Sequence, residues 1–223
     1  MGWNAKATGG YAKESAQAKE NCTLIYNILS GRGWTHNAIC ACLGNNNHEG
    51  QYNPWRWEAD NVPTKSQYDT EWKDAYNHGY GMWGFTPPSK YIENAYAKSV
   101  TGYAPNFSDQ AGQATDGRAQ TYFMDSGGSG WIKRERFNYM SFDEYKKSNE
   151  SLYYLTQVFL YCFENPANPE ASFSDRYQAA QYWDEYFRGV TPDPDPDPPP
   201  EPPEPEPSPT VNDRRRWKFW LFL

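Results

Sequence analysis

Residues 43–57, LGNNNHEGQYNPWRW, place a single carboxylate, Glu49, between an apolar segment and a run of aromatic residues. An acid just past a helix C-terminus lies near the negative end of the helix dipole, and nearby aromatic rings limit its hydration. Both effects favour the protonated form. A carboxylic acid that keeps its proton near neutral pH is what glycoside hydrolysis needs to protonate a leaving oxygen. The competing interpretation of Glu49 is a solvated loop acid.

Most glycosidases use a second acid. Glu58 and Asp60 follow Glu49 by nine and eleven residues, which is near enough in sequence to line the same cleft. Either side chain could orient a water molecule as general base, and each could equally be a structural or solvated loop residue. Asp69 and Glu71, on a predicted helix, are weaker candidates for this role.

The stretch GYGMWGF, residues 79–85, is the second candidate for a binding element. Its glycines favour a tight turn that exposes backbone N–H and C=O groups to a ligand. The alternative is a buried turn that packs helices together. If the turn binds a sugar, the predicted contacts from both segments are Tyr52, Trp55, Trp57, Tyr80, Gly81 and Trp83.

Other chemistries find little support in the sequence. HEGQY at His48 is not HExxH, and His36 and His78 fall in no recognisable ligand pattern, so neither a metal site nor a cofactor is predicted. No phosphate-binding glycine loop is present. The cysteines show no CxxC spacing and are interpreted as small buried hydrophobic residues, with a disulfide left open. They are Cys22, Cys40, Cys42 and Cys162.

The composition is rich in aromatic residues and modest in charge. The 223 residues include 10 Trp, 18 Tyr and 11 Phe, and the formal net charge is −7. Trp and Tyr carry a polar group and suit half-exposed surfaces such as sugar-binding clefts. Because the chain has no excess of basic residues, its bulk charge gives no reason to expect a nucleic-acid partner.

The hydrophobic pattern predicts one mainly helical domain of short helices with long loops. Thr35 is a predicted N-cap, and Ser141 with Glu144 forms a predicted capping box. The last helix is predicted to bury Phe173, Tyr177, Ala180, Trp183 and Phe187. Helices are predicted over 15–31, 35–44, 66–78, 88–98, 107–125 and 141–148, from 152 to just before NPANP, and around 173–187, with a short hairpin within 45–65.

The segments quoted above, taken together, resemble the phage tail lysozyme family over roughly residues 20–188. GWTHNAICACLGNNNHEGQYNP is similar to the family's segment with a glutamate ahead of Asn-Pro, and GYGMWGFTPPSKY is similar to a second family segment. The penultimate helix ends in FENPANP, which is similar to the family's F-E-x-P-x-x-P run. The resemblance implies an α+β lysozyme-like fold, mainly helical, and places Glu49 where the family's catalytic glutamate stands.

The resemblance also implies a substrate, the glycan strand of peptidoglycan, and a place of action, a phage tail or the bacterial wall. If neither Glu58 nor Asp60 positions water, a substrate acetamido or 6-hydroxyl group could assist, the latter as in a lytic transglycosylase. Gly84 replaces a family glutamine and Gly50 a common serine, which implies altered substrate contacts. The rival hypothesis is a non-catalytic wall-binding module on a virion.

The expected organisation has four parts. A flexible N-terminus over 1–14 precedes the lysozyme-like catalytic domain over 15–190. Residues 191–209 form an acidic, proline-rich spacer, and residues 210–223 a basic aromatic tail. The end of this tail, 214–223, is predicted to dock on a virion tail protein or a membrane surface, or to have no function. The N-terminus has no apolar h-region, so no signal peptide is predicted.

Overall fold

The computed structural model describes residues 2–61, 78–92, 110–127 and 130–193. These residues form a mainly helical domain, and their only sheet-like pairings are isolated bridges. The helices are α1 (Ala16–Gly31), α2 (His36–Asn46), α4 (Ser89–Ile92), α6 (Gln110–Asp125), α7 (Phe142–Lys146), α8 (Leu152–Phe159) and α9 (Pro169–Phe187). Two 3-10 turns (Glu58–Asp60 and Glu135–Phe137) and a π-helical turn (Leu160–Glu164) complete them.

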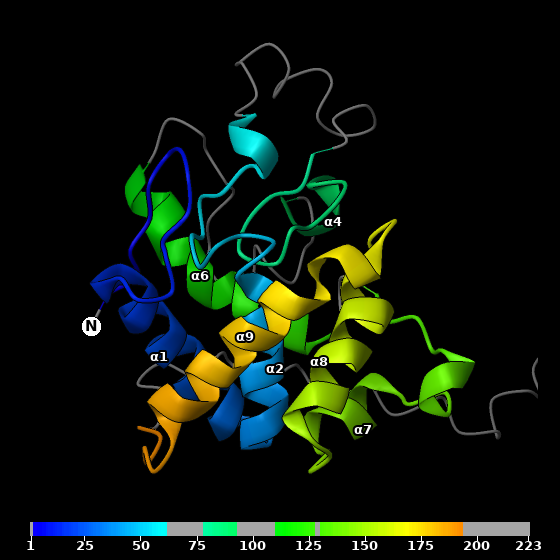
Figure 1. Cartoon of the computed structure of the whole chain (residues 1–223). Coiled ribbons are helices and arrows are strands. Elements are labelled where there is room, and N and C mark those ends of the chain that lie inside the picture. Colours follow the sequence, from blue (N-terminus) through cyan, green and yellow to red (C-terminus); the bar gives the residue numbers. More distant parts are fainter. Residues whose placement is uncertain (1, 62–77, 93–109, 128–129, 194–223) are drawn as a thin grey trace, which may run out of the picture.

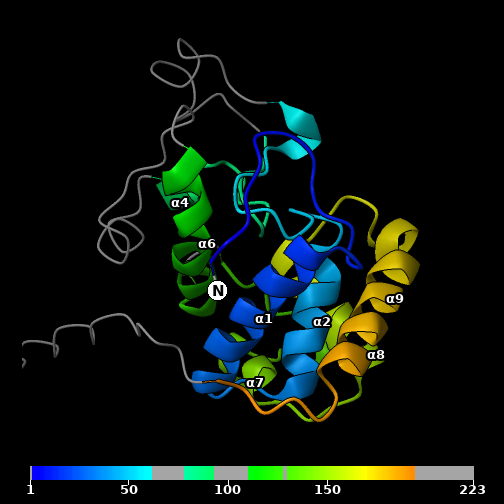
Figure 2. The same cartoon turned by 90° about the vertical axis from the view of Figure 1, so that its left-hand side faces the viewer.

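Helix α2 is the centre of the domain. Every residue from Ala38 to Asn46 is buried, so this helix is covered on all sides. Helices α1, α8 and α9 pack directly against it, and α9 crosses in front of it in Figure 1. The view in Figure 2 shows α1 on the opposite flank of α2 from α9. The C-terminal end of α2 leads into the turn-rich segments at the top of Figure 1.

The helix starts follow the predicted capping chemistry. The Thr35 side chain accepts a hydrogen bond from Ala38 N, which confirms the predicted cap of α2. Both bonds of the capping box between Ser141 and Glu144 are present at the start of α7. These caps satisfy backbone N–H groups that no helical partner can reach, which is why sequence signals locate them well.

Two isolated antiparallel bridges are found among the described residues in place of the predicted short hairpin. Trp57 pairs with Tyr80, and Tyr80 pairs with Phe85, so the region after α2 is joined to the glycine-rich turn. Arg56 and Gly79 extend this link, because Gly81 N donates to Arg56 O at 2.7 Å and Glu58 N donates to Gly79 O at 2.9 Å. The pairing is therefore between two distant segments and not within 45–65.

The N-terminal residues, for which a flexible segment was predicted, make hydrogen bonds to the rest of the domain. Asn4 exchanges two hydrogen bonds with the buried Asn21 of α1, at 2.8 and 2.9 Å. Lys6 N donates to Asn53 Oδ1 at 3.2 Å, and Tyr11 N donates to Gln51 O at 2.9 Å. These polar contacts carry no periodic signal, so a search for hydrophobic patterns does not detect them.

The buried face of α9 is also rotated from the predicted one. Phe173 and Tyr177 are only partly buried, stack on each other and meet Tyr153 edge to face, whereas Ser172 and Arg176 are buried instead. The prediction of a purely apolar face was therefore wrong over the first half of this helix. A buried arginine within the face needs a specific partner, and this partner lies in the site described below.

Several predictions concern residues outside the described ranges. They are the helix over 66–78 with Asp69 and Glu71, the ends of the helices predicted over 88–98 and 107–125, and most of the spacer and all of the tail. The four cysteines are buried and free. Within the described part of the chain, none of the helices is long and apolar enough to cross a membrane.

Candidate active site

Glu49 lies in a tight turn that follows α2 directly. Gln51 N donates to Asn46 O at 2.9 Å, and Tyr52 N donates to the Asn46 side chain at 2.9 Å, so the turn folds back on the helix end. Gly50 N donates to Met82 O at 3.2 Å. A Cβ at Gly50 would come within 2.2 Å of Met82 Cα, so only glycine allows this close approach of the two backbones.

The glycine-rich turn of residues 79–85 forms the facing wall. Gly81 has a φ of +80° and packs against Gln120, whose Oε1 accepts from Met82 N at 2.8 Å. Gln120 also donates through Nε2 to Pro54 O at 2.7 Å. One side chain of α6 thus fixes both the turn and the segment after Glu49.

Arg176 of α9 is the direct partner of Glu49. Its Nη2 lies 2.5 Å from Glu49 Oε1, and only 1% of the arginine side chain is exposed against 25% of the glutamate. The guanidinium is held in place by Ser172 Oγ at 3.1 Å and by the backbone and side-chain oxygens of Asn45 at 3.2 Å. Aromatic rings were predicted to surround Glu49, but its Oε1 instead faces the buried guanidinium of Arg176.

A second carboxyl, Glu164, reaches the same pocket from the π-helical turn Leu160–Glu164. Asn165 ends this turn in the left-handed region, with a φ of +47° and its N–H donating to Leu160 O at 2.8 Å. Burial raises the pKa of the Glu164 carboxyl well above its ordinary value, the charge of Glu49 raises it further, and Arg176 opposes both. π-turns are found frequently at functional sites.

These groups open into one pocket of about 630 Å³ with a mainly polar wall. Such a volume suits a ligand of several rings. Its lining residues include His48, Glu49, Arg56, Glu58, Gly81, Trp83, Gly84, Lys90, Glu164, Asn168, Ser172 and Arg176.

The two candidate bases differ in position. Glu58 lines the pocket with Glu49, is 59% exposed at its side chain, and accepts from Gly79 N at 2.7 Å. Asp60 does not line it. The Asp60 carboxylate pairs with Arg56, which itself lines the pocket, and accepts from Gly9 N at 2.5 Å.

The predicted sugar-contacting residues divide in the same way. Gly81 and Trp83 line the pocket. Four others are buried in the core and do not line it, although Tyr80 and Trp57 pack together behind the wall at a ring separation of 4.6 Å. These four are Tyr52, Trp55, Trp57 and Tyr80, with at most 6% of each residue exposed.

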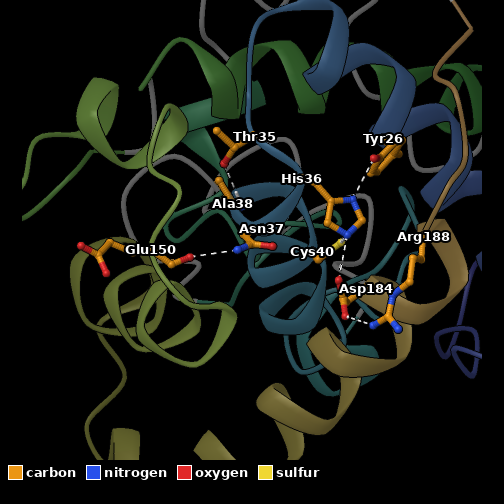
Figure 3. Close-up of polar contacts among 9 residues, drawn as sticks. All are labelled: Tyr26, Thr35, His36, Asn37, Ala38, Cys40, Glu150, Asp184 and Arg188. Atoms are coloured by element: carbon orange, nitrogen blue, oxygen red, sulfur yellow. Dashed lines mark hydrogen bonds and ion pairs between the residues drawn. The ribbon is translucent and has the colours of Figure 1, made fainter.

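A Cys-His-Asp arrangement lies elsewhere, between α2 and α9 (Figure 3). His36 Nε2 lies 2.8 Å from Asp184 and 3.7 Å from Cys40 Sγ, and its Nδ1 lies 2.9 Å from Tyr26 Oη. The thiol is fully buried, and this burial raises its pKa, so it does not form the thiolate that nucleophilic catalysis requires. We interpret this cluster as a structural contact between helices.

No metal site emerges from the described ranges, because none of their His, Cys, Asp and Glu residues gather in groups of three or more that could hold an ion. Sequence reasoning found Glu49 and the glycine-rich turn but missed the roles of Arg176 and Glu164. Two signals in the sequence were available. Glu164 lies in the FENP run at the end of the penultimate helix, and Arg176 lies four residues before Ala180 in the buried stripe of α9.

Comparison with known proteins identifies the family of the chain. A family described as phage tail lysozyme matches residues 20–187. The morphogenesis protein 1 of Bacillus phage B103 is 31% identical over 173 residues, which cover 73% of this chain. The aligned part spans only 38% of that relative. The description of the family as lysozymes implies glycoside hydrolase activity at the family level.

Proposed function

Because the chain belongs to the phage tail lysozyme family, we propose that it degrades bacterial peptidoglycan by cleaving a glycosidic bond of the glycan strand, with Glu49 as general acid. The observation that carries this proposal is the position of Glu49. This acid lines a large polar pocket between the end of α2 and the glycine-rich turn, and Arg176 fixes its orientation.

The chemistry needs a proton at the glycosidic oxygen and a nucleophile at the sugar carbon. In this proposal Glu49 delivers the proton as the bond to the leaving sugar breaks. Glu58 orients the attacking water, since it shares the pocket with Glu49, whereas Asp60 does not line the pocket and is paired with Arg56. The products of the reaction distinguish an inverting from a retaining mechanism, and they also show whether the substrate's own groups assist.

Trp83 is the side chain we assign to substrate contact. Trp83 lines the pocket although only 1% of the residue is exposed, and its buried Nε1 has no hydrogen-bond partner among the described residues. An indole N–H without an acceptor is suited to the oxygen of an acetamido group or a sugar hydroxyl. The backbone of Gly81 lies beside it on the same wall.

The setting we propose is a phage tail, acting on the wall during infection or lysis. Support comes from the family description as phage tail lysozyme and from the relative in phage B103, which is named morphogenesis protein 1. The aligned part covers 38% of that relative, and the proposal for this chain is limited to the lysozyme activity.

The test is mass spectrometry of the soluble fragments released from purified sacculi by the wild-type protein and by Glu49→Gln. We expect muropeptides with reducing ends from the wild type and at least about 100-fold slower release from the variant, because general acid catalysis contributes that much or more. Circular dichroism of both proteins controls for folding.

Two other outcomes would change the proposal. Fragments with anhydro-sugar ends would keep Glu49 as the acid but make the reaction a transglycosylation. Sedimentation of the wild type with sacculi from several wall types, without released fragments, would overturn the glycosidase and favour a wall-binding module, with Gly84 as the first residue to examine.

A further inference from the structure

The carboxyl groups of Glu49 and Glu164 and the guanidinium of Arg176 belong to residues that line the same pocket. Arg176 donates to Ser172, Asn45 and Glu49, and none of its hydrogen bonds goes to Glu164. Glu164 is half-buried as a residue, but its Oε1 is closed off from solvent and has no hydrogen-bond partner among the described residues.

This arrangement has a charge requirement. A carboxylate without a hydrogen-bond donor at a closed-off oxygen is costly to keep ionised, and a second carboxylate beside it adds repulsion. One buried guanidinium compensates one negative charge. The set of Glu49, Glu164 and Arg176 is therefore most stable with a single proton on one of the two carboxyls, and the pair titrates as a unit.

We propose that Glu164 is a positioning residue for the proton of the general acid: its carboxyl offsets Arg176, so that the pocket keeps one proton near neutral pH and Glu49 can deliver it. When the proton lies on Glu49, Glu164 carries the negative charge that balances the guanidinium. This inference deepens the proposed function and rests on it.

The raised pKa of the Glu164 carboxyl agrees with this assignment, since burial and the charge of Glu49 are its causes. The other charged or titratable groups around it come from three directions. The end of α2 supplies His48 and the buried Cys42, the segment after Glu49 supplies Arg56 and Glu58, and α4 supplies Lys90.

The first measurement uses no substrate. Carbon NMR of the glutamate carboxyls is followed against pH in the wild type, Glu164→Gln and Glu49→Gln. We expect one carboxyl, absent in Glu164→Gln, to ionise at a pH well above the ordinary value of about 4.3. In Glu49→Gln this carboxyl should ionise at lower pH because its negative neighbour is gone. A Glu164 signal that titrates in the ordinary range would overturn the proposal.

The second measurement is the pH profile of kcat/KM on solubilised glycan fragments. Glu164→Gln should move the alkaline limb toward lower pH by about one unit, which means about a tenfold loss above that limb and near wild-type activity at acidic pH. Glu170→Gln, a change at an exposed glutamate of α9 that bonds Tyr161 outside the pocket, should leave the profile unchanged.

Two results of this second measurement contradict the proposal. An unchanged profile in Glu164→Gln would show that the residue does not affect the acid, and an equal loss at every pH would show a purely structural role. If the wild type released no fragments at all, the proposed glycosidase would fail, while the NMR titration would still decide whether Glu164 holds the shared proton.

Discussion

At the scale of single residues, Gly84 determines how much space Glu49 has. A Cβ at this position would lie 3.0 Å from Glu49 Oε2 and 3.5 Å from Glu49 Cβ. Gly84 also has a φ of +57°, a conformation that side chains other than glycine rarely adopt. A glutamine, which the resemblance described above predicts at this position, therefore does not fit this turn without a change in its backbone.

Gly84→Gln should consequently lower activity without unfolding the protein. We expect kcat/KM to fall by about tenfold or more, since a displaced catalytic acid is costly, and stability to fall by about 1–2 kcal/mol from the left-handed backbone. Gly33→Gln is the matched control, because Gly33 has a φ of +82° with open space around its Cβ position. Equal activity losses in the two variants would show that contact with Glu49 is not the cause.

Glu164 should also make stability depend on pH. Its pKa is raised in the folded protein, so its contribution is fully present below the unfolded value of 4.5 and is lost as pH rises through the folded value. Glu164→Gln cannot ionise and should escape this loss. The melting temperature of Glu164→Gln should rise relative to that of the wild type as the pH increases from 5 to 8. A difference in melting temperature that stays constant across this range would argue against a buried, protonated Glu164.

At the scale of elements, the contact between α2 and α9 carries the acid and its partner. Glu49 follows the end of α2 and Arg176 lies in α9, so the spacing of these helices sets the ion pair. Gly44 allows the close approach, because a Cβ there would come within 2.5 Å of Arg176 O and 2.6 Å of Ala180 Cβ. The position of the proposed acid Glu49 relative to Arg176 therefore depends on how closely α2 and α9 pack.

Gly44→Ala should therefore destabilise the domain despite the better helix propensity of alanine. The expected loss is about 1–3 kcal/mol, the usual cost of overpacking a core, accompanied by reduced activity as Arg176 shifts. Gly31→Ala near the end of α1 is the control, since its Cβ would meet nothing within 4 Å. Urea unfolding measures both variants, and a Gly44→Ala protein as stable as the control would contradict the close-packing argument.

The elements themselves were largely predictable, for local reasons. The caps at Thr35 and Ser141 and the apolar periodicity of α1 depend on neighbours within one or two turns, and both locate helices well. The rotated face of α9 could not be read this way. Its buried Arg176 is stabilised by Asn45 and Glu49, which are more than 120 residues away in the sequence.

At the scale of the whole molecule, the site depends on contacts that cross the chain. The sequence patterns located Glu49 and the glycine-rich turn because both lie in quoted motifs. They did not reveal that Gln120 of α6 joins this turn to Pro54, or that Glu164 enters from a π-turn. Polar side chains that join distant segments have no period, so a single sequence gives little sign of them.

Asp125 is the clearest such junction away from the pocket. It is 4% exposed, lies at the end of α6, and accepts from Trp34 Nε1 at 2.7 Å. It also pairs with Arg32, just past α1, and with Lys146 of α7, whose Nζ lies 3.6 Å from Asp125 Oδ1. One carboxylate therefore links the ends of three helices, and neither Asp125 nor its partners line the pocket.

Asp125→Ala should destabilise the whole domain while leaving the chemistry of the pocket intact. We expect a loss of about 2–4 kcal/mol, because it leaves a buried indole N–H unsatisfied and removes one carboxylate partner from each of Arg32 and Lys146. Asp125→Asn should cost less, since its oxygen can still accept from Trp34. Urea unfolding gives these differences, and kcat/KM measured well below the transition should stay close to wild type. A large loss of activity in the folded Asp125→Asn protein would mean that this junction and the pocket are coupled, contrary to their separation in the fold.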